Sequence, residues 1–166
     1  MKTKSIGFIG AILIPFLAGC ASTPVVLERV GPAPATSTAY APTGWLRVLT
    51  ATETHEIGDD TYYYPHTGYR IYTAAGKVWK FIPNHSDNMD ETAALVQIPE
   101  GHYDIHAQSE SYGAVIVPVL IKAEKTTEVH LESRWKIPPN AGTNEVVYLP
   151  NGDPVGWKSA LAKSSE

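Results

Sequence analysis

The sequence predicts an all-β fold, a β-sandwich of about seven to eight strands. Beyond residue 44, apolar and polar residues alternate in short runs, and turn residues separate these runs about every ten positions. The composition agrees, because 13 Gly and 13 Pro in 166 residues are too many for a helical bundle. A chain with 43% hydrophobic residues is also too apolar to be disordered. Its length suits one folded domain.

The strands are expected where β-forming residues alternate. The pattern is strictest over residues 102–108, where Tyr103, Ile105 and Ala107 share one face. Pro118 interrupts a valine-rich run and therefore predicts an edge strand or a bulge. Asn151 and Gly152 predict a tight turn between the last two runs. The runs are 45–52, 69–73, 77–82, 94–98, 102–108, 113–122, 127–131, 145–149 and 154–157.

The first twenty residues resemble the export signal of a bacterial lipoprotein. Two lysines precede the uncharged apolar stretch 6–17, which has the length of a secretory signal core. The residues Leu17-Ala18-Gly19-Cys20 then match the lipobox: Leu, a small residue, Gly or Ala, and Cys. The resemblance implies that residues 1–19 are removed and that Cys20 carries a diacylglycerol thioether and an N-acyl chain. We expect no other cofactor.

An uncleaved anchor helix is the alternative, because no charge lies between Ser5 and Glu28. Pro15 and Gly19 make this stretch a poor helix. Cys20 is the single cysteine of the chain, which excludes an intramolecular disulfide and a Cys-based zinc site. The lipoprotein interpretation is therefore favoured.

The charge of the chain limits its partners. The formal net charge of −4 argues against a nucleic-acid surface. Removing Lys2 and Lys4 from the 13 basic residues leaves 11 against 17 acidic residues, a net charge of −6. Attachment to the membrane is therefore expected through acyl chains and not through charge. The resemblance to lipoproteins implies a location in the cell envelope. If the host is Gram-negative, the family's sorting rule for the residue after the cysteine, here Ala21, implies the outer membrane, facing the periplasm or the surface.

The remaining chain divides into three parts. Residues 20–43 hold the lipidated N-terminus and a Pro-, Ala- and Thr-rich stretch, which predicts an extended tether with a reach of roughly 70 Å. The sandwich is expected over residues 44–157, and a disordered tail over residues 158–166. The sequence does not predict an oligomeric state.

Residues 98–132 resemble the carboxypeptidase-regulatory or transthyretin-like (prealbumin-like) sandwich. Pro99, Gly101, Tyr103 and Ala107 match its first segment, and the remainder is matched by Tyr112-Gly113 and by Thr127, Val129 and Leu131. The usual Ala-Gly turn reads Ala123-Glu124-Lys125, so its glycine is missing. The resemblance implies a Greek-key sandwich and leaves the function open.

Two polar stretches are candidate ligand sites. In 59–66, Tyr62, Tyr63 and Tyr64 with His66 could stack on and hydrogen-bond a sugar. Alternatively, Tyr62 and Tyr64 pack into the core and Tyr63 lies at its rim. The loop 84–91, which includes His85, carries carboxylates and amides that could hold calcium, but it lacks the EF-hand spacing and is otherwise a solvated turn. No metal ligand is assigned. His130, between two glutamates, is expected to face solvent.

Catalysis has little support. The chain contains no Gly-x-Ser-x-Gly elbow, no His-Glu-x-x-His and no glycine-rich phosphate loop. The expected function is non-catalytic, a structural module or one that binds an envelope protein or polysaccharide. The alternative is a carbohydrate- or calcium-binding module that uses the loops 59–66 and 84–91, and a hydrolase is the third hypothesis.

Overall fold

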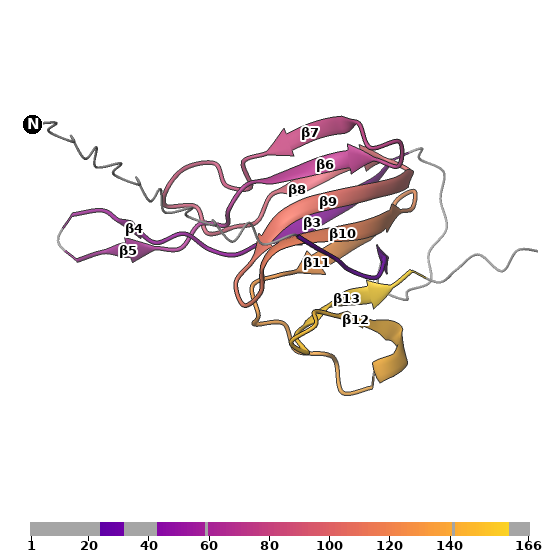
Figure 1. Ribbon diagram of the computed structural model, residues 1–166. Helices are drawn as coiled ribbons and strands as arrows, with labels where there is room; N and C mark the ends of the chain where they lie inside the picture. The colour runs from indigo at the N-terminus through magenta and orange to yellow at the C-terminus, as the bar shows by residue number, and fades with distance from the viewer. Residues whose placement is uncertain (1–23, 32–42, 59, 141, 160–166) are drawn as a thin grey trace, which may run out of the picture.

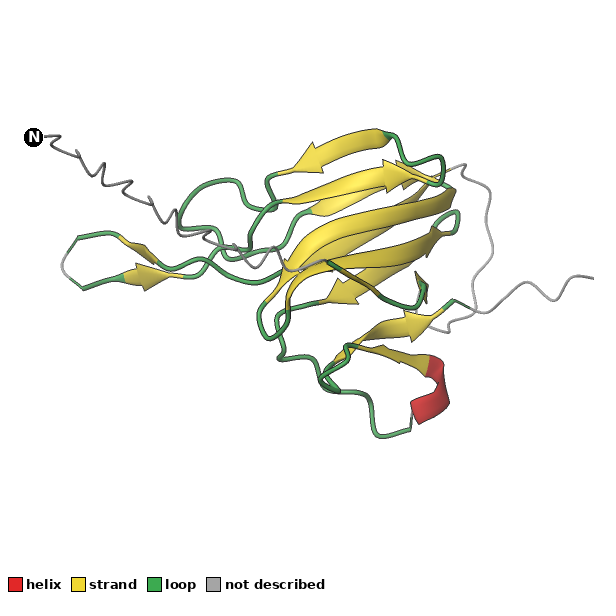
Figure 2. Ribbon diagram, viewed as in Figure 1, coloured by secondary structure: helices red, strands yellow, loops and turns green. Residues whose placement is uncertain are grey.

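The computed structural model describes residues 24–31, 43–58, 60–140 and 142–159, and it confirms the all-β sandwich (Figures 1 and 2). The strands are β1 Val25–Val26, β2 Val30–Gly31, β3 Thr43–Leu49, β4 His55–Glu56, β5 Tyr62–Tyr63, β6 Tyr69–Thr73, β7 Val78–Ile82, β8 Leu95–Pro99, β9 Gly101–Ser109, β10 Gly113–Ile121, β11 Thr126–His130, β12 Val146–Tyr148 and β13 Pro154–Lys158, with a 3-10 turn at Thr143–Glu145. The runs expected from alternation all contain a strand.

The strands form two main sheets. The large sheet has the order β12-β13-β2-β10-β9-β6-β7, and β1 also pairs with β10. The small sheet has the order β11-β3-β8. The strand β9 pairs with β10 along its whole length, from Gly101 opposite Ile121 to Ser109 opposite Gly113. This pairing puts the alternating apolar residues of both strands on one face, as the sequence predicts.

The core lies between the two sheets. The large sheet contributes the inward residues of β9 and β10, such as Ile105 and Val117, and the small sheet contributes Leu46, Val48 and Val129. All five side chains are fully buried. Burying each one stabilises the fold by roughly 1.5–3 kcal/mol relative to leaving it in water.

The N-terminal part of the expected tether belongs to the large sheet. Residues Val25 and Val26 pair in parallel with Val115 and Ile116, and Val30 pairs with Val119. Leu27 and Val30 are buried in the core. The prediction of a tether is therefore wrong for residues 24–31, because β10 offers a free edge and these apolar residues fill its inner side. Residues 20–23 and 32–42 lie outside the described residues.

Pro118 lies opposite the break between β1 and β2. The pair Val26 and Ile116 is followed by the pair Val30 and Val119, so the N-terminal segment has one residue more than β10 between them. Within β10, Pro118 pairs with Asp104 of β9 without a shift in register, and β10 is an interior strand. The prediction of an edge strand or a bulge at Pro118 is therefore wrong. A proline is tolerated there because no residue of β1 or β2 pairs with it on the other side.

The C-terminal boundary also differs slightly from the expectation. Lys158 is the last residue of β13 and pairs with Val30, so the predicted tail does not begin there. Residues 160–166 lie outside the described part of the chain.

In the turn before β11, Glu124 has a left-handed backbone conformation. The transthyretin-like family, which residues 98–132 resemble, usually has a glycine in this turn. Glu124 has a φ of 55°, and its N–H donates to the carbonyl of Thr43. A side chain in this conformation costs roughly 1 kcal/mol, whereas glycine adopts it freely.

We expect Glu124→Gly to raise the free energy of unfolding by about 0.5–1 kcal/mol, measured by urea denaturation. Glu124→Ala is the matched control, since it removes the same charge but keeps the strained backbone. An equal gain in both variants would assign the effect to the charge instead.

Candidate functional site

The candidate site lies at the end of the sandwich where β3, β9 and β11 finish. Backbone hydrogen bonds join the segments at this end, from the Ala51 N–H to Gln108 and from the Glu110 N–H to Leu131. A cleft of about 280 Å³ opens there. This volume is close to the lower limit for small-molecule sites. The cleft is lined by Leu49, Thr52, Tyr64, His66, Glu91, Glu132 and Arg134.

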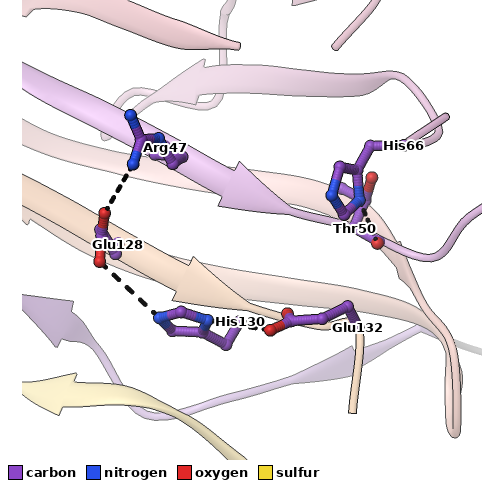
Figure 3. A network of polar contacts seen from close by, with 6 residues as sticks. All are labelled: Arg47, Thr50, His66, Glu128, His130 and Glu132. Atoms are coloured by element: carbon purple, nitrogen blue, oxygen red, sulfur yellow. Dashed lines mark hydrogen bonds and ion pairs between the residues drawn. The ribbon is translucent and has the colours of Figure 1, made fainter. Parts of the chain in front are cut away.

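His66 is held in one orientation beneath this cleft. The side chain is buried, and its Nδ1 lies 2.8 Å from the carbonyl oxygen of Thr50 (Figure 3). Because a carbonyl only accepts hydrogen bonds, Nδ1 carries the hydrogen. This contact fixes the plane of the ring, and among the described residues no hydrogen bond to Nε2 is found.

Tyr64 brings together the two loops that the sequence singles out. Its backbone N–H donates to Oε1 of Glu91 at 2.8 Å, which joins the loops 59–66 and 84–91 across 27 residues of chain. The Tyr64 side chain is 43% exposed, so its ring borders the cleft instead of entering the core. The prediction that Tyr62 and Tyr64 pack into the core is wrong, since Tyr62 is also 46% exposed.

Glu132 supplies a carboxylate with one unused oxygen. The residue is 9% exposed, and its Oε1 accepts a hydrogen bond from Nδ1 of His130 at 3.1 Å. Its Oε2 is buried and has no hydrogen-bond partner among the described residues. A buried carboxylate oxygen without a donor costs free energy, because it has lost its hydrogen bonds to water.

A row of polar side chains continues from Glu132 along the outer face of the small sheet (Figure 3). Nε2 of His130 lies 3.9 Å from Oε2 of Glu128, and Oε1 of Glu128 lies 3.2 Å from Nη1 of Arg47. The ring of Trp135 stacks on His130 with centroids 4.6 Å apart and 6° between planes. The expectation that His130 faces solvent is therefore wrong, because Trp135 covers it.

Asn84 fixes the backbone beneath the cleft. Its Nδ2 donates to the carbonyl oxygen of Val48 at 2.9 Å. The same atom lies within hydrogen-bond distance of Oγ1 of Thr50 and of the carbonyl oxygen of Thr67. Its Oδ1 accepts from the N–H of Ala94 at 3.0 Å. The side chain is buried and joins four segments, so it sets the positions of the loops on which the cleft residues stand.

The other predicted ligand residues lie away from the cleft. Tyr62 and Tyr63 form β5, which pairs with His55 and Glu56 of β4 in a hairpin that extends away from the two sheets (Figure 1). His85 is half-buried, and its Nδ1 lies 3.0 Å from the carbonyl of Asp87 within its own loop. Of the five ligand candidates, the structure brings Tyr64 and His66 together. Cys20 lies outside the described residues.

The acidic loop 84–91 uses its carboxylates on its own backbone. Asp90 accepts from the N–H and Oγ of Ser86 and from the N–H of Thr92. The hydrogen bonds from Ser86, ahead of those from Thr92, hold the pKa of Asp90 well below its usual range. Asp87 accepts from the N–H of Met89 at 2.8 Å. Within the described ranges, no group of three or more His, Cys, Asp or Glu residues is placed to hold a metal ion.

Sequence reasoning missed three side chains of the cleft, Glu91, Glu132 and Arg134. Glu91 ends the acidic loop that the sequence marks as polar, but its contact with Tyr64 exists only in the folded chain. Glu132 lies two residues after the end of β11. The alternation of β11 places Glu132 on the outer face, but Leu131 and Glu132 are both buried, so the pattern could not predict the burial of Glu132.

Comparisons with protein-family models, with curated proteins and with solved structures return no match to this chain. Among the described residues, no helix has both the length and the apolar character needed to cross a membrane.

Proposed function

We propose that the protein is a membrane-anchored cell-envelope lipoprotein whose sandwich is a non-catalytic binding module, and that a saccharide segment occupies the cleft. The observation that carries this proposal is the cleft itself, which combines the half-exposed Tyr64 ring with the exposed charged side chains of Glu91 and Arg134. The lipobox Leu17-Ala18-Gly19-Cys20 supports the anchor.

A saccharide suits the chemistry of these groups. A sugar ring has an apolar face that can stack on Tyr64, and it has several hydroxyl groups that can donate. The carboxylate of Glu91 can accept from sugar hydroxyl groups, and Arg134 can donate to ring and hydroxyl oxygens. Calcium is less suitable, because the carboxylates of Asp87 and Asp90 already accept from the loop backbone.

A binding role is favoured over hydrolysis by the sequence, which has no nucleophile elbow and no zinc-peptidase motif. Cys20 would carry lipid and therefore could not act as a nucleophile. The hydrogen-bond partner of His66 among the described residues is the backbone carbonyl of Thr50. This contact orients the imidazole ring but does not pair it with the hydroxyl or thiol that a nucleophilic hydrolase needs.

We expect Tyr64→Ala to weaken binding of the best glycan about tenfold, which corresponds to roughly 1.4 kcal/mol of lost stacking. A glycan array with the mature protein in detergent finds the glycan, and calorimetry of wild type and variant measures Kd. Tyr62→Ala is the matched control, because Tyr62 has similar exposure but lies on the hairpin. A uniform loss in both variants, or an array without any bound glycan, would contradict the proposal.

We expect Cys20→Ala to abolish labelling with radioactive palmitate and to release the protein from membranes. The reason is that the acyl chains would supply most of the attachment, since an acidic mature chain is not drawn to a lipid surface by its charge. Labelling and membrane fractionation in a bacterial host measure both effects. Normal processing and membrane retention of the variant would contradict the lipoprotein interpretation.

A further inference from the structure

The folded domain begins very close to the proposed lipid attachment point. Pro24 is the first described residue, and β1 starts at Val25. From Cys20 to Pro24 there are four residue spacings, which reach at most about 14 Å in a fully extended chain. The start of β1 must therefore stay near the bilayer surface whenever the lipid on Cys20 is inserted. The tether with a reach of roughly 70 Å that the sequence predicts does not separate β1 from the lipid, because residues 25–31 already belong to the sheet.

The strand β1 also belongs to one particular face of the sandwich. The pairing register aligns Val26 with Ile116, and then with His106, Arg70 and Phe81 across the large sheet. The neighbouring row, Val115, Ala107, Tyr69 and Ile82, is buried in the core. Because side chains alternate between faces, the row from Val26 to Phe81 points outward. We call this surface the large-sheet outer face.

The large-sheet outer face carries exposed apolar side chains among a few polar ones. The next outward row across the same strands contains Pro118, Asp104, Tyr72 and Val78. Val26, Val78 and Phe81 are more than half exposed. Val26 lies in β1 at one end of the first row, and Val78 and Phe81 lie in β7 at the other end of the two rows. Exposed apolar side chains at both ends of one face indicate a surface that contacts a partner or a membrane.

The charge of this face also differs from that of the whole protein. In the two outward rows, Asp104 is the single acidic residue, whereas the mature chain carries a net charge of −6. Arg70 makes no ion pair with a described residue, and its guanidinium lies 5.6 Å from the centre of the Phe81 ring. An exposed arginine beside an aromatic ring suits the phosphate and glycerol region of a bilayer.

We propose that the large-sheet outer face rests on the bilayer surface beside the lipid anchor, with Phe81 and Val26 in the headgroup region and Arg70 on lipid phosphates. This inference rests on the proposed lipidation of Cys20. The short connection to Pro24 favours a bilayer over a second copy of the chain, because it holds the β1 end of this face near the membrane whenever Cys20 is inserted. Stable attachment of a protein to a membrane generally needs two contributions, and here the acyl chains and this face together would supply them.

Site-directed spin labelling of the full lipidated protein in phosphatidylethanolamine–phosphatidylglycerol vesicles tests the inference. The mature chain has no free thiol once Cys20 is acylated, so Phe81→Cys introduces a single labelling site. Leu95→Cys is the matched control: Leu95 is 46% exposed against 52% for Phe81, and it lies in β8 opposite Arg47 on the outside of the small sheet. Collision rates of each label with oxygen and with a water-soluble nickel chelate give its depth.

We expect the label at position 81 to collide several-fold less with the nickel chelate, and more with oxygen, than the label at position 95. Equal collision rates at the two positions would overturn the docking while leaving the anchor intact. Spin–spin broadening at position 81 without shielding from the chelate would also overturn it, and would assign the face to a second copy. Mass spectrometry of the N-terminal peptide tests the lipidation of Cys20 separately. An unmodified Cys20 would overturn both the lipid anchor and the docking of the large-sheet outer face.

Discussion

Replacing Gly44 with alanine is expected to lower the free energy of unfolding by about 3 kcal/mol, the upper end for overpacking a well-packed site. Gly44 lies in β3, where a Cβ would lie against the carbonyl oxygen of Lys122 and 2.9 Å from that of Lys125. Both contacts involve backbone, so no side-chain rotation can relieve them. The same segment is held by the hydrogen bond from the Trp45 N–H to Lys125.

Urea denaturation followed by tryptophan fluorescence measures this loss for Gly44→Ala. Gly142→Ala is the matched control, because a Cβ there meets only the side chain of Glu145 at 3.7 Å. We expect the control to change stability by less than about 0.5 kcal/mol. If the two variants were equally stable, the close packing of β3 against the turn at 122–125 would be wrong.

Asn84→Ala is the second substitution expected to be severe, with a loss of about 3 kcal/mol. The variant removes the donor to Val48 and the acceptor of the Ala94 N–H, and it leaves both backbone groups without these partners. Asn84 also has a φ of 75°, a conformation that asparagine tolerates better than alanine.

Two further variants make this result specific. Asn84→Asp keeps the size of the side chain and the acceptor for Ala94, but it loses both donors and places a carboxylate against carbonyl oxygens, so we expect a loss of similar size. Asn88→Ala, at an exposed residue of the same loop, should be neutral. Thermal unfolding by circular dichroism measures all three. A stable Asn84→Asp variant would contradict the role given to the Nδ2 donors.

The sequence predicts the parts of the fold that depend on alternation. The strict pattern of 102–108 and the valines after Gly113 identify β9 and β10 and also their inner faces, because one face of each strand is buried. β1 and β2 could not be predicted in this way. Each has two residues, and they lie among prolines, so their strand structure comes from the edge that β10 offers them and not from local preference.

The candidate site was predictable only in part. Tyr64 and His66 stand out in the sequence because aromatic and histidine side chains are concentrated between 59 and 66. Their relation to Glu132 depends on the ends of β3 and β11 lying together in the small sheet, where Leu49 pairs with His130. The burial of His130 depends on a stacking contact with Trp135, five residues further along, which no periodic pattern encodes.

The parallel pairing of β1 with β10 has a consequence for the order in which the molecule folds. Val25 pairs with Val115, some ninety residues later in the chain, so the first strand to be synthesised waits for one of the last partners. Closing so long a loop is slow compared with forming the β9–β10 hairpin. We therefore expect β9 and β10 to form early and the N-terminal segment to complete the sheet late, after its partner edge has been built.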